Sequence, residues 1–112
     1  MLREITAVCL LCIAMNAQAG SLDGNKLVKG MRDYESFERD GSQVATSKAT
    51  HFLGYVSGVA DAVNGVLYCP PQNANLGQAA SIVVQFMSAN PARWSESAAV
   101  LVVDALKKAF PC

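Results

Sequence analysis

The N-terminal segment decides how much of this 112-residue chain is left to fold. Arg3 precedes an apolar run at residues 5–15, and Ala-Gln-Ala follows at residues 17–19. A positive start, a short apolar run and a small-x-small triplet are typical of a cleaved export signal, whereas a membrane span needs about 20 apolar residues. We therefore expect a Sec signal peptide at residues 1–19 and one domain at residues 20–112. A buried first helix is the alternative.

Two of the four cysteines, Cys69 and Cys112, remain after removal of the signal. An even number of cysteines in an exported protein favours a disulfide, because the compartment is oxidising. The chain-entropy model assigns a loop of this size roughly 4 kcal/mol of stabilisation. Two free thiols or half of a metal site are the alternatives, but a metal site needs more ligands and His51 is the only histidine.

Apolar residues recur at helical spacing in four segments of the remaining chain. The predicted helices cover residues 23–39, 47–67, 76–89 and 95–109. Ser47 and Asn75 are suited to cap the second and third helices, and Pro70 and Pro71 cannot continue a helix. The pattern predicts an all-α domain, a small four-helix domain stapled by one disulfide, with Asn64-Gly65 inside the second helix. A strand at residues 81–86 is the main alternative.

Charged residues are few and unevenly placed. They make up 16% of the chain, with nine basic and nine acidic residues, and this balance gives no electrostatic basis for binding nucleic acid or an anionic membrane. Residues 62–92 contain no charge and include the whole third helix. Interface cores are also depleted of charge, so we expect this helix either to be central in the domain or to face another protein chain.

Small residues recur every fourth position on the second helix, at Gly54, Gly58 and Ala62. This spacing allows a second backbone to approach closely. We expect these residues, together with Val83 and Met87 of the third helix, to serve helix packing within the domain or a homodimer contact.

The residues provide no pattern typical of catalysis, a metal site or a cofactor, so we expect a protein that is not an enzyme. Ser57 lies in Gly-Tyr-Val-Ser-Gly, which lacks the spacing of a nucleophile elbow. His51 and Cys69 could form a base and nucleophile pair only if the thiol were free.

Partner binding is instead expected in two places. Tyr68, Gln72 and Asn73 lie beside Cys69, and a loop pinned by a disulfide loses little entropy on binding. Arg93 and Trp94 belong to the residue types most common among binding hot spots, although Trp94 could simply cover the core.

Four segments carry a recognisable pattern: GNKLV, FLGYVSGVADAV, CPPQNANLGQAASIVVQFMSANP and AAVLVVDALKKAFPC. In this order they resemble the periplasmic Rap/Tai-type immunity proteins of type VI secretion, over most of residues 24–112. The resemblance implies a small helical periplasmic protein, often a homodimer, that binds a cognate secreted peptidoglycan amidase and blocks its active site. Relatives commonly carry a second cysteine pair where this chain has Met31 and Phe52.

A protein of another class remains the alternative. A small periplasmic acid-stress chaperone, or another periplasmic binding or structural protein, would also be helical and held by one disulfide. Such a chaperone exposes apolar surface as its acids are protonated at low pH.

Overall fold

The computed structural model describes residues 22–41 and 46–112, so the expected signal peptide lies outside the described residues. They form α2 (Gly24–Asp40), α3 (Thr46–Val63), α4 (Leu76–Ala89), the 3-10 helix η2 (Pro91–Arg93) and α5 (Ala98–Ala109). The described ranges contain no strand, which confirms the all-α prediction. The alternative of a strand at residues 81–86 is wrong, because these residues lie within α4.

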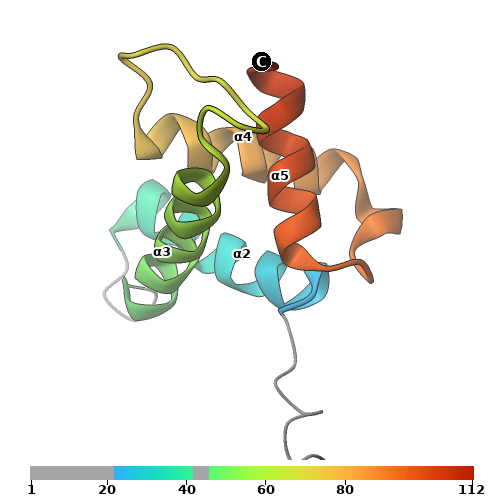
Figure 1. Ribbon diagram of the computed structural model, residues 1–112. Helices are drawn as coiled ribbons and strands as arrows, with labels where there is room; N and C mark the ends of the chain where they lie inside the picture. Colours follow the sequence, from blue (N-terminus) through green and yellow to red (C-terminus); the bar gives the residue numbers. More distant parts are fainter. Residues whose placement is uncertain (1–21, 42–45) are drawn as a thin grey trace, which may run out of the picture.

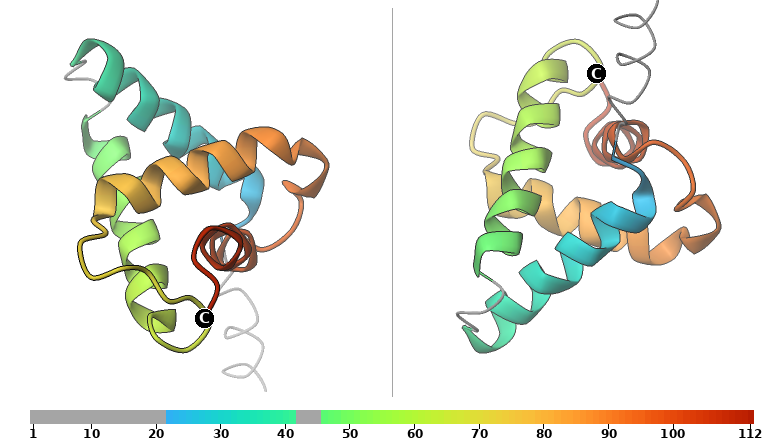
Figure 2. Two further views of the ribbon diagram at one scale, coloured as in Figure 1. Left: turned by 90° about the horizontal axis from the view of Figure 1, so that it is seen from above. Right: turned by 90° about the horizontal axis from the view of Figure 1, so that it is seen from below.

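Each of the four described α-helices contacts the other three (Figure 1). Seen from above and from below, α2 and α3 form a V, α4 lies across its arms, and α5 stands end-on between their open ends (Figure 2). None of the described helices is long and apolar enough to cross a membrane.

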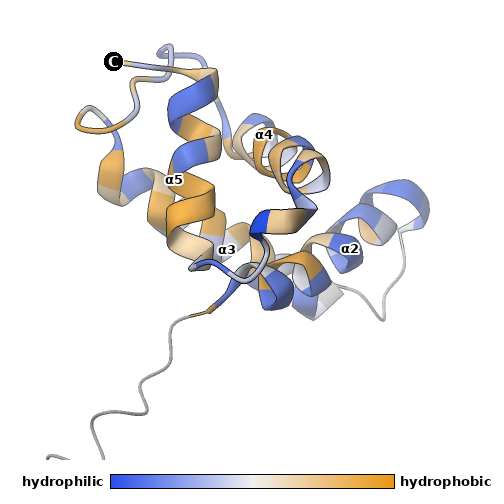
Figure 3. Cartoon of the chain, turned by 90° about the vertical axis from the view of Figure 1, so that its right-hand side faces the viewer, coloured by the Kyte–Doolittle hydropathy of each residue, from blue (hydrophilic) through white to orange (hydrophobic). Residues whose placement is uncertain are grey.

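The core lies where all four helices meet. Its largest fully buried side chains are Leu27, Phe52, Val56, Val83, Met87, Leu101, Val102 and Leu106. Hydrophobic residues are concentrated on α3, α4 and α5, while the outer side of α2 is largely hydrophilic (Figure 3). Met31 and Phe52, which replace the second cysteine pair of relatives, are both buried in this core, and the Phe52 ring lies 5.4 Å from that of Tyr34.

The predicted disulfide is confirmed. Cys69 and Cys112 are bonded, with their Cα atoms 4.8 Å apart and a sequence separation of 43. The backbone N–H of Cys69 also donates to the carbonyl oxygen of Phe110 at 2.9 Å. The segment that follows α3 is thus fastened to the end of α5.

The third predicted helix is confirmed at both ends as α4, Leu76–Ala89. The Asn75 side chain accepts the N–H of Gln78, and the Gln78 side chain accepts the N–H of Asn75, each at 3.0 Å. This reciprocal capping box satisfies two donors that the start of a helix otherwise leaves free.

The second helix is shorter than predicted, because Asn64-Gly65 forms a turn rather than continuing it. Gly65 has a φ of 75°, in the left-handed region that favours glycine. The N–H groups of Val66 and Leu67 then donate to the carbonyl oxygen of Val63, at 3.0 and 2.9 Å. Val66 and Leu67 therefore lie outside the helix, although the sequence pattern predicted a helix over residues 47–67.

The last helix begins at Ala98, three residues later than predicted. The intervening segment runs beside the start of α2 instead, where the N–H of Gly24 donates to Glu96 and that of Ala98 donates to Leu22, at 2.9 and 2.8 Å. These backbone hydrogen bonds replace the first helical turn.

The charge-free α4 is not enclosed in the centre of the domain, so that alternative is wrong. Ala80, Val83 and Met87 are completely buried, but Ser81, Gln85 and Ser88 form an exposed, uncharged face. A helix of a small four-helix domain necessarily keeps one side in contact with solvent.

Candidate functional site

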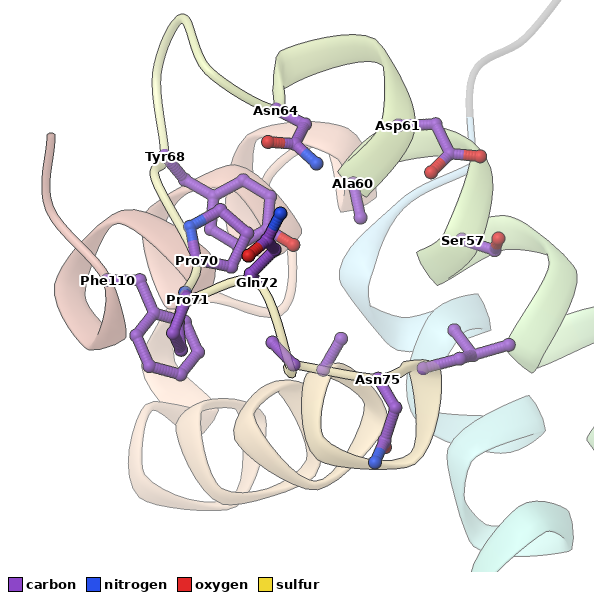
Figure 4. A pocket seen from close by; sticks show the side chains of 13 residues that line it. Ser57, Ala60, Asp61, Asn64, Tyr68, Pro70, Pro71, Gln72, Asn75 and Phe110 are labelled. Atoms are coloured by element: carbon purple, nitrogen blue, oxygen red, sulfur yellow. The ribbon is translucent and has the colours of Figure 1, made fainter.

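Residues 69–75, between the Cys69–Cys112 disulfide and the start of α4, form the disulfide-anchored segment. A cleft of about 410 Å³ lies beside it (Figure 4). One wall is the C-terminal half of α3, the other is the segment after Cys69, and the first turns of α4 form the base. The lining consists of Ser57, Ala60, Asp61, Asn64, Tyr68, Pro70, Pro71, Gln72, Ala74, Asn75, Leu76, Ala79 and Phe110.

The polar side of the cleft comes from the helical period of α3. Ser57 and Asp61 are four residues apart, so their side chains lie on one face of the helix, and Asn64 follows directly after its last residue. This face continues past the end of the helix into the turn at Gly65, which brings Tyr68 back to the opposite wall.

The opposite wall is held by several independent contacts. The N–H of Gly65 donates to the carbonyl oxygen of Tyr68 at 2.8 Å, and the Tyr68 and Phe110 rings lie 6.5 Å apart. The Cys69–Cys112 disulfide and two fixed proline φ angles add further restraint. The wall is thus pre-organised, which reduces the ordering cost of binding a partner.

The cleft is weakly acidic. Asp61 is the only charged residue in its lining, and no ion pair in the described residues contains it. The pKa of Tyr68 is raised, first because its hydroxyl is desolvated and second because the Asp61 carboxylate is near. The Tyr68 hydroxyl is therefore uncharged, and the residue is only 6% exposed, so it contributes chiefly to the support of the wall.

Two of the residues expected to bind a partner, Tyr68 and Gln72, line this cleft. Asn73 is exposed in the same segment but is not part of the lining.

Arg93 and Trp94 lie at the opposite end of α4 and do not join the cleft (Figure 1). The Arg93 guanidinium bonds to Glu96 at 2.8 Å and to Asp104 at 2.7 Å, which raises the pKa of Arg93 and lowers that of Glu96. The Trp94 indole N–H donates to the carbonyl oxygen of Met87 at 2.9 Å. Arg93 thus connects η2 to α5, and Trp94 connects the residue after η2 to α4 and covers the edge of the core.

The residues expected at a helix contact divide into two groups. Val83 and Met87 are completely buried and pack within the domain. Gly54 and Gly58 are exposed, and a Cβ on either would meet nothing within 4 Å, so no second helix of this domain approaches them. Ala62 is exposed as well.

With the helical fold, the disulfide and the cleft established, the comparison with protein families becomes informative. The chain matches the Rap1a immunity proteins over residues 11–112. It belongs to this family. No curated protein and no solved structure matches it significantly.

In this Rap1a immunity protein, the described residues contain no group of three His, Cys, Asp or Glu side chains that could hold a metal ion. The sulfur of Cys69 is bonded to Cys112 and cannot serve as a nucleophile for His51. His51 lies instead in a second groove of about 270 Å³ between α2 and α3.

The α3 wall of the cleft was not recognised from the sequence. Ser57, Asp61 and Asn64 are spaced as one helical face, and this spacing is the signal that could have revealed them. The sequence predicts a helix that continues through Asn64 to residue 67, and such a helix has no opposite wall. The cleft exists only because the chain turns at Gly65.

Proposed function

We propose that the protein is a periplasmic immunity protein that binds a cognate type VI-secreted peptidoglycan amidase and occludes its active site. The match to the Rap1a immunity proteins over residues 11–112 carries this proposal. Membership of an immunity family supports a toxin as the partner, and the resemblance of the sequence motifs adds the amidase and the periplasm.

The surface that we propose for the toxin is the cleft together with the apolar residues at its border. Val66, Leu67 and Leu76 are 73%, 43% and 40% exposed, and they flank the two ends of the disulfide-anchored segment. An exposed apolar border around a rigid, nearly uncharged wall has the composition of an interface core. Tyr68, Gln72 and Asn73 belong to this surface.

Export and self-association complete the proposal. Removal of the signal peptide after Ala19 would deliver the domain to the compartment where a cell-wall amidase acts. The exposed Gly54 and Gly58 on α3 leave that helix face available to a second copy, as the homodimer implied by the resemblance requires. Light scattering of the mature protein checks this part of the proposal.

A growth assay tests the function. The amidase encoded beside this gene, if directed to the periplasm, should lyse cells that lack the immunity protein. We expect co-expression of the full-length chain to restore growth, and deletion of residues 2–19 to abolish the protection at equal protein levels. Lysis despite an exported, soluble immunity protein would contradict the proposal.

Two matched variants test the proposed surface within the same assay. Val66→Asp places a charge in the apolar border, and we expect it to weaken protection because the carboxylate would be desolvated in the complex. Val100→Asp makes the same change at a valine of α5 that is 48% exposed and lies outside the cleft lining. If both variants protect cells fully, the toxin binds a surface other than the cleft and its apolar border.

A further inference from the structure

The cleft contains both a carboxylate and an apolar strip, and one long cationic side chain could contact both. Asp61 provides one carboxylate, Ser57 lies one turn before it on the same face of α3, and Asn64 adds an amide from the turn that follows the helix. The opposite wall and the base are mixed, because Gln72 and Asn75 lie there beside an apolar strip formed by Pro70, Pro71 and Leu76. A long side chain with an apolar stem and a cationic end matches this arrangement.

The geometry of a contact with Asp61 distinguishes between the two long cations. The Tyr68 ring lies across the cleft from Asp61 (Figure 4), but it is only 6% exposed and packs against Phe110, so the carboxylate is the group that a cation can reach. A guanidinium group is planar and donates in two parallel directions to a carboxylate, whereas an ammonium group is a compact, strongly hydrated point charge. Arginine therefore fits the cleft better than lysine.

Asp61 is available for such a contact. It is exposed, and no ion pair in the described residues contains it. No other charge lines the cleft, and residues 62–92 contain none. A partner that covered the cleft without a cation would leave a desolvated carboxylate unpaired, which is costly.

We propose that this cleft receives an arginine side chain of the partner protein, with the guanidinium on Asp61 and the stem against Leu76 and the proline wall. The identity of that partner as a toxin rests on the proposed function. The arginine acts as a specificity determinant. A related toxin without it would desolvate Asp61 and form no compensating hydrogen bonds, so its complex would be weaker.

A titration of the mature protein tests the arginine site without the toxin. The probes are acetyl-Leu-Arg-Leu-amide and the same peptide with citrulline, which keeps the shape of arginine but carries no charge. We expect the arginine peptide to shift the amide resonances of Asn64, Gln72 and Leu76. Citrulline in the peptide, or Asp61→Asn in the protein, should weaken binding by up to about fivefold, the upper size of an exposed ion pair.

Asp33→Asn is the matched control, because it removes the same charge from the groove between α2 and α3. This variant should bind the arginine peptide as the wild type does. Equal affinity for the arginine and citrulline peptides, or no shift of cleft resonances at the solubility limit, would overturn the proposal.

A second measurement uses the complex with the amidase. Asp61→Asn should weaken the complex and reduce the salt dependence of its affinity, whereas Asp33→Asn should not. If wild type and Asp61→Asn inhibit equally well, the arginine site is wrong and the immunity function stands. If the wild type does not bind the amidase, the immunity function fails, and the peptide titration still decides the arginine site.

Discussion

Gly24 lies so close to Trp94 that a Cβ on the glycine would be 2.6 Å from the tryptophan carbonyl oxygen. That oxygen accepts the N–H of Asn25 at 2.9 Å, and the N–H of Gly24 donates to Glu96 at the same distance. Only a residue without a side chain allows the start of α2 to reach the segment before α5. The glycine of the GNKLV motif is therefore required by packing.

Gly24→Ala should lower the free energy of unfolding by about 1–3 kcal/mol, because the added methyl group displaces backbone rather than a flexible side chain. Gly30→Ala is the control, since a Cβ on this glycine inside α2 would make only an ordinary contact, 3.5 Å from the Cβ of Phe52. That substitution should raise the stability by up to about 1 kcal/mol. Urea unfolding measures both, and a stabilising effect of Gly24→Ala would show that the close approach is absent.

Reduction of Cys69–Cys112 should lower the free energy of unfolding by about 4 kcal/mol, as the chain-entropy model gives for this loop. Urea unfolding with and without reductant measures the difference, and the Cys69→Ser/Cys112→Ser double variant should behave like the reduced protein. In the reduced protein, the amide protons at Tyr68 and Gln72 should also exchange faster. If the urea concentration at the midpoint of unfolding were the same with and without reductant, the disulfide would not stabilise the fold.

The Arg93–Glu96 ion pair predicts a pH dependence of stability. Hydrogen bonding to Arg93 lowers the pKa of Glu96 below its ordinary value of 4.5. The folded protein thus favours the charged carboxylate, and this contribution is present above the pKa of the unfolded chain and is lost as pH falls through the lower folded pKa. Below about pH 4.5, the wild type should lose stability more steeply than Glu96→Gln. Parallel curves for the two proteins would contradict the prediction.

Acid treatment also distinguishes the immunity protein from an acid-stress chaperone. No polar or charged side chain is buried in the described residues, so protonation would not disrupt a buried ion pair. We expect the mature protein to bind no more of an apolar-surface dye at about pH 3 than at neutral pH. A large rise in dye fluorescence on acidification would favour the chaperone.

Features that depend on local chemistry could be predicted from the sequence. Asn75 predicted the start of α4 because an asparagine cap acts on its own first turn. The bond between Cys69 and Cys112 could be predicted because the expected removal of residues 1–19 leaves only this pair.

Features that depend on distant contacts could not be predicted. Asn64-Gly65 is compatible with a helix or a turn, and the attachment of Cys69 to the end of α5 favours the turn. Ser97 pairs with Asp23 instead of joining α5, which no local pattern indicates. The cleft requires both the turn at Gly65 and the Cys69–Cys112 disulfide. Only the disulfide could be predicted from the sequence.

A peptidoglycan digestion assay with purified proteins tests the immunity function most directly. The amidase encoded beside this gene is incubated with increasing amounts of the mature protein, and release of peptide stems is measured. Occlusion predicts that activity falls linearly and vanishes when every amidase molecule has a bound partner. Digestion at the rate of the free amidase in the presence of excess mature protein would contradict the proposed inhibition.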